Sequence, residues 1–78
     1  MITADDFKKR LDVINAYWKV MCKYVKCTGT EEECDNLVSD VDKLHAVLGK
    51  TPFSKEIGIA VVNEIDRIMT MNKKQEEK

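Results

Sequence analysis

The chain has few of the residues that interrupt regular secondary structure: one proline and three glycines among 78 residues. This composition excludes collagen-like repeats and low-complexity linkers. The longest apolar run, from Ile57 to Val62, is far too short to span a bilayer. Because Met1 opens into a polar segment without the apolar middle of a cleavable signal, we expect a cytoplasmic protein that has no membrane partner.

The length of the chain is sufficient for one domain and favours self-association. A chain this short buries only about two-thirds of its unfolded surface, so a second copy that adds buried area would stabilise it. We therefore expect a homodimer or a higher oligomer.

Amphipathic periodicity predicts an all-α fold, a three-helix bundle with a long first helix. The expected helices span residues 4–26, 31–48 and 54–71, followed by a polar tail over 72–78. Thr3 is a good N-cap for the first helix, and Thr30 followed by Glu33 forms a capping box for the second. The third helix has Thr51 or Ser54 as its cap.

The first helix carries more apolar surface than one core needs, because two apolar stripes run along it at spacings of four and three residues. We assign one stripe to the core. The predicted core consists of Leu11, Ile14, Trp18, Met21, Leu37, Val41, Leu44, Leu48, Ile57, Val61, Ile65 and Ile68.

The second stripe, Val13, Tyr17, Val20 and Tyr24, is then left for a partner. Tyrosine suits such a surface because its ring buries apolar area while its hydroxyl tolerates water. The alternative is that the second and third helices cover both stripes inside the bundle.

Charge is unevenly distributed, although the net charge is only −1. Residues 1–26 carry six basic and three acidic side chains, and residues 31–50 carry six acidic and two basic ones. Lys19, Lys23 and Lys26 form a candidate anion-binding face on the first helix. A nucleic-acid or phosphorylated-ligand binder is therefore the alternative function, but the chain lacks the overall basic excess typical of nucleic-acid binding.

Metal binding, cofactors and catalysis are not expected from the sequence. Cys22, Cys27, Cys34 and His45 are separated by four, six and ten residues, whereas structural zinc sites usually have tight pairs. We expect free thiols, and a bridge between Cys27 and Cys34 stays open. One histidine without a nearby nucleophile offers no catalytic arrangement.

These observations favour a non-catalytic protein-binding module, a stoichiometric regulator or inhibitor that self-associates through its first helix. Stand-alone proteins of this size commonly come from phages or mobile elements and block a larger protein. The sequence identifies neither the partner nor the pathway.

Overall fold

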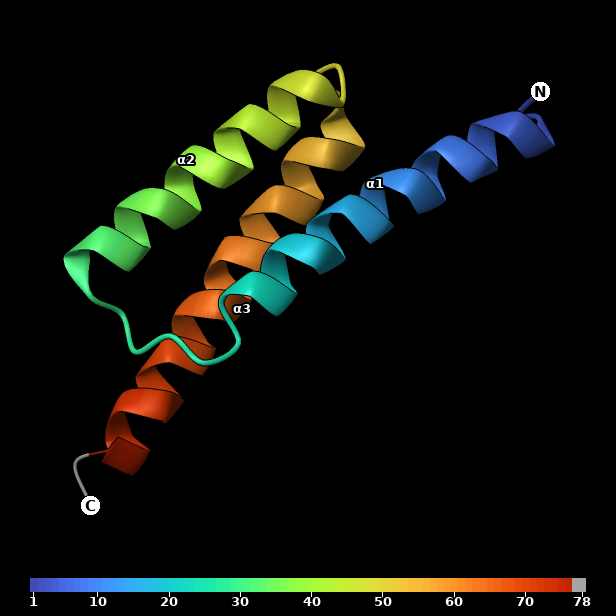
Figure 1. Cartoon of the computed structure of the whole chain (residues 1–78). Helices are drawn as coiled ribbons and strands as arrows, with labels where there is room; N and C mark the ends of the chain where they lie inside the picture. The colour runs from blue at the N-terminus through green and yellow to red at the C-terminus, as the bar shows by residue number, and fades with distance from the viewer. Residues whose placement is uncertain (77–78) are drawn as a thin grey trace.

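A computed structural model describes residues 1–76, which form three helices and, within that range, no strand. They are α1 (Ala4–Lys23), α2 (Glu31–Val47) and α3 (Pro52–Glu76). In Figure 1, α1 and α3 run in the same direction and α2 runs opposite to both. Each helix contacts the other two. The prediction of an all-α, three-helix protein is therefore confirmed.

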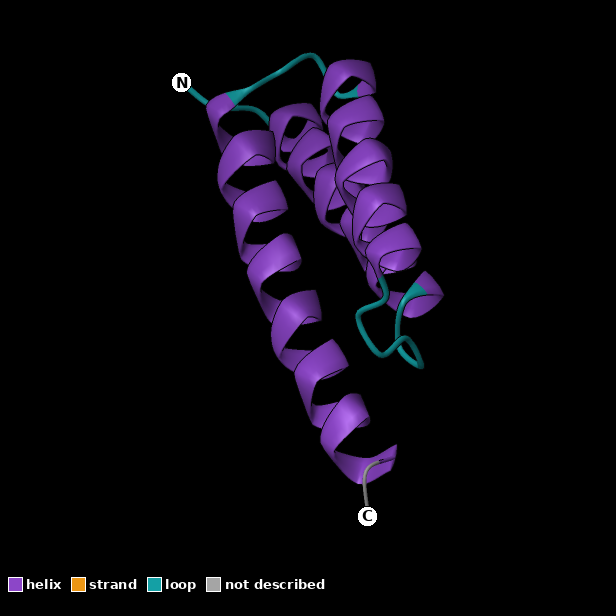
Figure 2. Ribbon diagram, turned by 90° about the vertical axis from the view of Figure 1, so that its left-hand side faces the viewer, coloured by secondary structure: helices purple, strands orange, loops and turns teal. Residues whose placement is uncertain are grey.

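The helices are staggered along the long axis of the bundle. The N-terminal turns of α1 extend beyond the α2–α3 turn (Figure 1), and the C-terminal turns of α3 extend beyond the α1–α2 connection (Figure 2). The molecule measures 53 × 19 × 16 Å. Its radius of gyration is 14.3 Å, whereas a compact domain of this length has about 11.5 Å. The stagger therefore leaves part of α1 without neighbours from its own chain.

Both predicted N-terminal caps are confirmed. The backbone N–H of Asp6 donates to Thr3 Oγ1 over 3.2 Å, and the Thr3 N–H donates back to Asp6 Oδ2 over 3.0 Å. At α2, the Glu33 N–H donates to Thr30 Oγ1 over 3.2 Å, and the Thr30 N–H donates to Glu33 Oε1 over 2.9 Å. Each pair of bonds supplies partners at a helix end, where backbone donors have no carbonyl within the helix to reach.

The first helix ends at Lys23, earlier than the predicted end at residue 26. The Tyr24 N–H donates to the Met21 carbonyl, three residues back, and the Cys27 N–H donates to the Tyr24 carbonyl. These shorter hydrogen-bonded turns tighten the chain, so residues 24–26 form a turn instead of continuing the helix.

The third helix begins at Pro52, two residues before the predicted start. The Ser54 N–H donates to Thr51 Oγ1 over 3.2 Å, which identifies Thr51 as the capping residue. Proline suits the first helical position because its missing N–H has no partner to lose there.

The third helix also continues to Glu76, five residues past the predicted end. Asn72 Nδ2 donates to the backbone carbonyls of Val25 and Cys27, each over 2.9 Å. This anchor and the good helix formers that follow it extend the helix through most of the predicted polar tail. Positions 77 and 78 of that tail lie outside the described residues.

The buried apolar side chains come from all three helices and are Val13, Tyr17, Tyr24, Leu37, Val61, Ile65 and Met69. The predicted core is confirmed at Leu37, Val61 and Ile65. Predicted positions that are partly buried against this core are Met21, Val41, Leu44, Leu48 and Ile57. Ile68 is half-buried.

The predicted core is wrong on α1, where the structure exchanges the two stripes. Leu11, Ile14 and Trp18 are exposed to 54%, 46% and 61%. Periodicity does not rank the two stripes, because both repeat at the same spacing. Tertiary contacts decide, since α2 and α3 provide hydrogen-bond partners for the hydroxyls of Tyr17 and Tyr24. A buried hydroxyl without such a partner is costly, so these partners allow the tyrosine stripe to pack inside the bundle.

Candidate protein-binding surface

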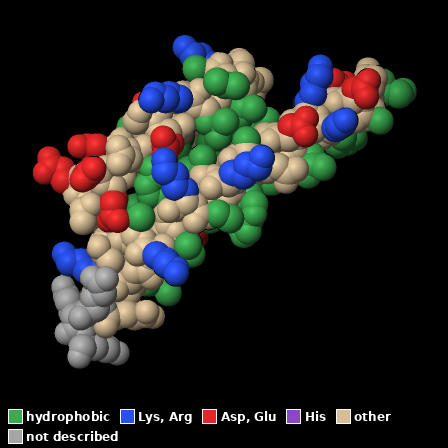
Figure 3. Space-filling model, in the orientation of Figure 1, with side chains coloured by type: hydrophobic (Ala, Val, Ile, Leu, Met, Phe, Trp, Pro, Cys, Tyr) green, Lys and Arg blue, Asp and Glu red, His purple; other side chains and the backbone are tan. Residues whose placement is uncertain are grey.

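A row of apolar side chains on one side of α1 faces solvent. This outer stripe consists of Phe7, Leu11, Ile14 and Trp18 on α1 and Val25 in the turn that follows it, with exposed fractions between 46% and 63%. Its first four members are spaced four, three and four residues apart, so they share one face of the helix. In Figure 3, hydrophobic side chains lie along the side of α1 that points away from α2.

The outer stripe is large for the surface of an isolated domain. Each aromatic side chain has roughly 150–250 Å² to bury. With exposed fractions of 63% and 61%, Phe7 and Trp18 together present roughly 250 Å² before the aliphatic members are included. Soluble monomers rarely expose contiguous apolar patches of more than a few hundred Å², and larger patches mark interaction sites. The outer stripe is therefore the strongest candidate for a binding surface.

The four residues predicted to contact a partner lie inside the bundle and form its inner stripe: Val13, Tyr17, Val20 and Tyr24. Val13, Tyr17 and Tyr24 are exposed to only 8%, 1% and 3%, and Val20 is partly buried against them. The alternative, in which α2 and α3 cover this stripe, is what the structure shows. Surplus apolar surface on α1 does exist, but it is the outer stripe.

One of the three candidate anion-binding lysines is used within the fold. Lys23 Nζ lies 2.8 Å from Asp40 Oδ2, and the Tyr24 hydroxyl donates to the same oxygen over 2.6 Å. The hydrogen bonds from Lys23 and then Tyr24 lower the pKa of Asp40. Burial, followed by the bond to Asp40, raises the pKa of Tyr24. This cluster ties the end of α1 to the middle of α2.

The other two lysines remain exposed, Lys19 on α1 and Lys26 in the turn that follows it. At about 100° per residue, Lys19 and Lys8 lie along one edge of the outer stripe. The apolar surface therefore has a positively charged border. Of the three candidate lysines, Lys23 already has a carboxylate partner in Asp40.

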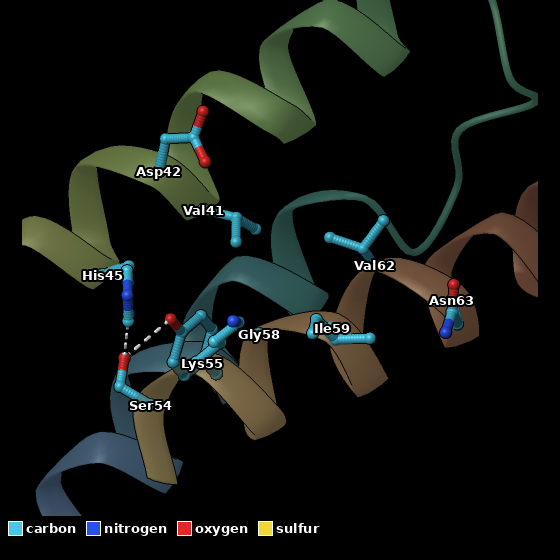
Figure 4. A pocket seen from close by; sticks show the side chains of 10 residues that line it. Val41, Asp42, His45, Ser54, Lys55, Gly58, Ile59, Val62 and Asn63 are labelled. Carbon is cyan, nitrogen blue, oxygen red and sulfur yellow. Dashed lines mark hydrogen bonds between the residues drawn. The ribbon is translucent and has the colours of Figure 1, made fainter. Parts of the chain in front are cut away.

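A cavity of about 480 Å³ lies between α2 and α3 (Figure 4). At one end of it, Ser54 Oγ lies 3.0 Å from the Tyr17 hydroxyl and 2.9 Å from His45 Nδ1. Ser54 is fully buried. One serine hydroxyl near the start of α3 therefore joins side chains from α1 and α2.

A serine bonded to a histidine is also the pairing of a nucleophile with a general base. Here the Ser54 hydroxyl is 0% exposed and is shared with Tyr17, so a substrate atom has no approach to it in this conformation. Asp42 lines the same cavity, but among the described residues no carboxylate forms a hydrogen bond with His45. The arrangement is better explained as a polar link between helices.

The cysteines are free thiols, and Cys27 and Cys34 do not form a disulfide. A hydrogen bond with Glu33, followed by burial, raises the pKa of Cys27. Within residues 1–76, no group of three or more histidine, cysteine, aspartate or glutamate side chains is arranged to hold a metal ion.

Comparison with known proteins finds no matching family model, no matching curated protein and no matching solved structure. In the part of the chain that the structure describes, no helix has the length and apolar content needed to cross a membrane. The surface and cavities of this chain are therefore what indicate its function.

The sequence contained a signal that distinguishes the two stripes. Tyr17 and Tyr24 need polar partners when buried, and Asp40 and Ser54 supply them from other helices. Gly58 also leaves room for a ring, because a Cβ at that position would lie 3.1 Å from the Tyr17 hydroxyl oxygen. A search for small and polar residues opposite the tyrosines would have favoured the tyrosine stripe as core.

Proposed function

We propose that this protein is a non-catalytic binding module that docks a protein chain on the outer stripe of α1 and acts as a stoichiometric regulator or inhibitor. The observation that carries the proposal is the exposure of this stripe on a helix whose other stripe already closes the core. The chain thus keeps a second apolar face that its own fold does not use.

The chemistry of the outer stripe fits protein recognition. Helical recognition uses anchors at spacings of three, four and seven residues, which Phe7, Leu11, Ile14 and Trp18 provide. Tryptophan is enriched among the residues that dominate binding energy, and Trp18 is 61% exposed in the isolated chain. The positive border beside the stripe favours a partner surface with acidic side chains at its rim.

Site-specific photocross-linking tests this function in cells that produce the full chain. A photoreactive phenylalanine analogue replaces Leu11 in one variant and Ile59 of α3 in the control, and both positions are 54% exposed. We expect ultraviolet light to give a discrete protein adduct from position 11 that position 59 does not give. Equal adduct yields from the two positions would contradict the proposal.

Salt separates this function from binding through phosphate groups. An apolar interface changes little between low and moderate salt, whereas binding through lysine–phosphate contacts weakens steeply. We expect the adduct yield at position 11 to persist at moderate salt. A steep loss would favour the phosphorylated-ligand or nucleic-acid alternative.

A further inference from the structure

We infer that the chain docked on the outer stripe is a second copy of this protein, with the two α1 helices packed antiparallel about a twofold axis. In this arrangement Phe7 of one copy lies against the partner's Trp18, and Leu11 lies against the partner's Ile14. The inference rests on the proposed function, because it requires the outer stripe to be a docking surface.

The chain exposes more surface than a compact monomer of its mass. The chain exposes 5971 Å², whereas a folded monomer of its mass, 9.0 kDa, is expected to expose about 4,900 Å². The excess is about 1,100 Å², and one partner in a standard stable interface contributes about 800 Å². This excess belongs to the whole elongated molecule, in which both α1 and α3 extend past their neighbours, and a second copy packed on α1 would cover the share that includes the outer stripe.

The spacing of the outer stripe on α1 is symmetric, so a second α1 rotated by 180° about a twofold axis presents the same pattern. The intervals of four, three and four residues read the same in both directions from a point between Leu11 and Ile14. A twofold axis at that point pairs an aromatic residue with an aromatic residue at each end and two aliphatic residues in the middle. Such self-complementarity is what an isologous interface requires.

The same spacing is that of a two-stranded coiled coil. Alternating intervals of four and three average 3.5 residues, the period that keeps an apolar seam facing a partner helix. Met21, which is half-buried, continues the pattern by one more position. The half-turn places Ala4 opposite the partner's Met21, so a small side chain meets a long one.

Charge decides between parallel and antiparallel pairing. Residues 4–12 carry three acidic and three basic side chains, whereas residues 13–26 carry three lysines and no acid. Parallel pairing would place the two lysine-bearing halves together, whereas antiparallel pairing places each of them against residues 4–12, whose acidic and basic side chains balance, and so avoids that repulsion. Antiparallel helix dipoles add to this preference.

Light scattering on a sizing column, in reductant and over a range of concentrations, tests self-association. Ile14→Glu places a charge in the middle of the outer stripe, and Ile59→Glu places the same charge on α3 as a matched control. The two isoleucines are 46% and 54% exposed, so neither substitution removes a buried core side chain, and Ile59 lies among the residues that line the cavity between α2 and α3, away from the outer stripe (Figure 4). We expect the wild type and Ile59→Glu to have the mass of a dimer, and Ile14→Glu to be a monomer with unchanged helical circular dichroism.

We expect the Ile14→Glu dissociation constant to rise at least about 100-fold, because an unpaired charge is buried in the interface. A wild type that stays monomeric at every concentration would overturn the inference. So would a control variant that dissociates as readily as Ile14→Glu. A monomeric wild type that still gives an adduct with a different protein at position 11 would overturn self-pairing but leave the proposed function standing. A monomer without any specific adduct would overturn both.

A thiol cross-link then tests the orientation. The variant carries Ala4→Cys, keeps Cys22, and has Cys27→Ser and Cys34→Ser. On one chain, positions 4 and 22 are about 27 Å apart along α1, so a short bifunctional thiol reagent cannot join them. We expect links from position 4 of one copy to Cys22 of the other. Links of each position only to itself would show parallel helices and overturn the antiparallel arrangement.

Discussion

The hydroxyl oxygen of Tyr17 lies 3.0 Å from Ser54 Oγ, which in turn lies 2.9 Å from His45 Nδ1. These three side chains belong to α1, α3 and α2, so this short series of hydrogen bonds joins all three helices at one level (Figure 4). Tyr17 and Ser54 are exposed to 1% and 0%. Water therefore has little access to replace a bond that a substitution removes.

Tyr17→Phe removes the first of these hydrogen bonds and keeps the aromatic ring. We expect the free energy of unfolding in urea to fall by about 1–2 kcal/mol, since Ser54 still bonds His45 but the link to α1 is lost. Ser54→Ala is the companion variant. Ser54→Ala should lower the free energy of unfolding less in the Tyr17→Phe background than in the wild type. If the two substitutions instead lower it by independent, additive amounts, the three side chains do not form a shared network.

Gly58→Ala tests how closely α3 packs against Tyr17. Alanine normally stabilises a helix interior by about 1 kcal/mol relative to glycine. Here the added Cβ would lie 3.1 Å from the Tyr17 hydroxyl oxygen and 3.4 Å from Val41 Cγ1. We therefore expect Gly58→Ala to destabilise the wild type.

Removal of the hydroxyl should relieve most of this crowding. Gly58→Ala is expected to be neutral or stabilising in the Tyr17→Phe background, as measured by urea unfolding of all four proteins. A loss of stability of the same size in both backgrounds would show that the hydroxyl does not limit the space, and that the ring carbon Cζ of residue 17 and Val41 Cγ1, each 3.4 Å from the added Cβ, do.

Features set by neighbouring residues along the chain could be predicted from the sequence. The caps at Thr3 and Thr30 depend on side chains three residues away, and both were predicted correctly. The ends of α1 and α3 were less predictable. Asn72 bonds the carbonyls that follow α1 from a position 45 and 47 residues away in sequence, and no local pattern contains that contact.

The orientation of α1 is the clearest case of a feature that periodicity did not decide. On a helical wheel, α1 has two apolar stripes with the same spacing. The inner stripe is the one that finds hydrogen-bond partners in Asp40 and Ser54 and space beside Gly58 on the other helices. A rule that ranks residues by apolarity places Trp18 inside and Tyr17 outside. Hydrogen-bond satisfaction places them the other way round, because Tyr17 has a polar partner in the core.

Neighbouring positions on α2 provide a direct test of which face is buried. Leu37 is 4% exposed and Val38 is 53% exposed. We expect Leu37→Ala to lower the free energy of unfolding by about 2–5 kcal/mol, through lost apolar burial and the cavity left behind. Val38→Ala should stay within about 0.5 kcal/mol of the wild type in the same urea titration. Similar costs at the two positions would contradict the observed orientation of α2.

The capping carboxylate of α2 predicts a pH dependence. Glu33 Oε1 accepts hydrogen bonds from the N–H groups of Thr28, Gly29 and Thr30 over 3.2, 3.0 and 2.9 Å. The bond from the Thr30 backbone, followed by that from Cys27, lowers the pKa of Glu33 from 4.5 to about 2. Because the folded state prefers the ionised form, its stabilising effect is complete above pH 4.5 and is lost as the pH falls towards 2.

Glu33→Gln keeps a side-chain oxygen as acceptor but does not titrate. The melting temperature of the wild type should exceed that of Glu33→Gln at neutral pH, and the gap should narrow as the pH falls from 4.5 to about 2. Glu32→Gln changes the net charge equally at the exposed neighbouring position, where no hydrogen bond joins the carboxylate to the cap. A gap that narrows equally for both variants would assign the effect to net charge and not to the cap, because only Glu33 loses its hydrogen-bonded ionised form on acidification.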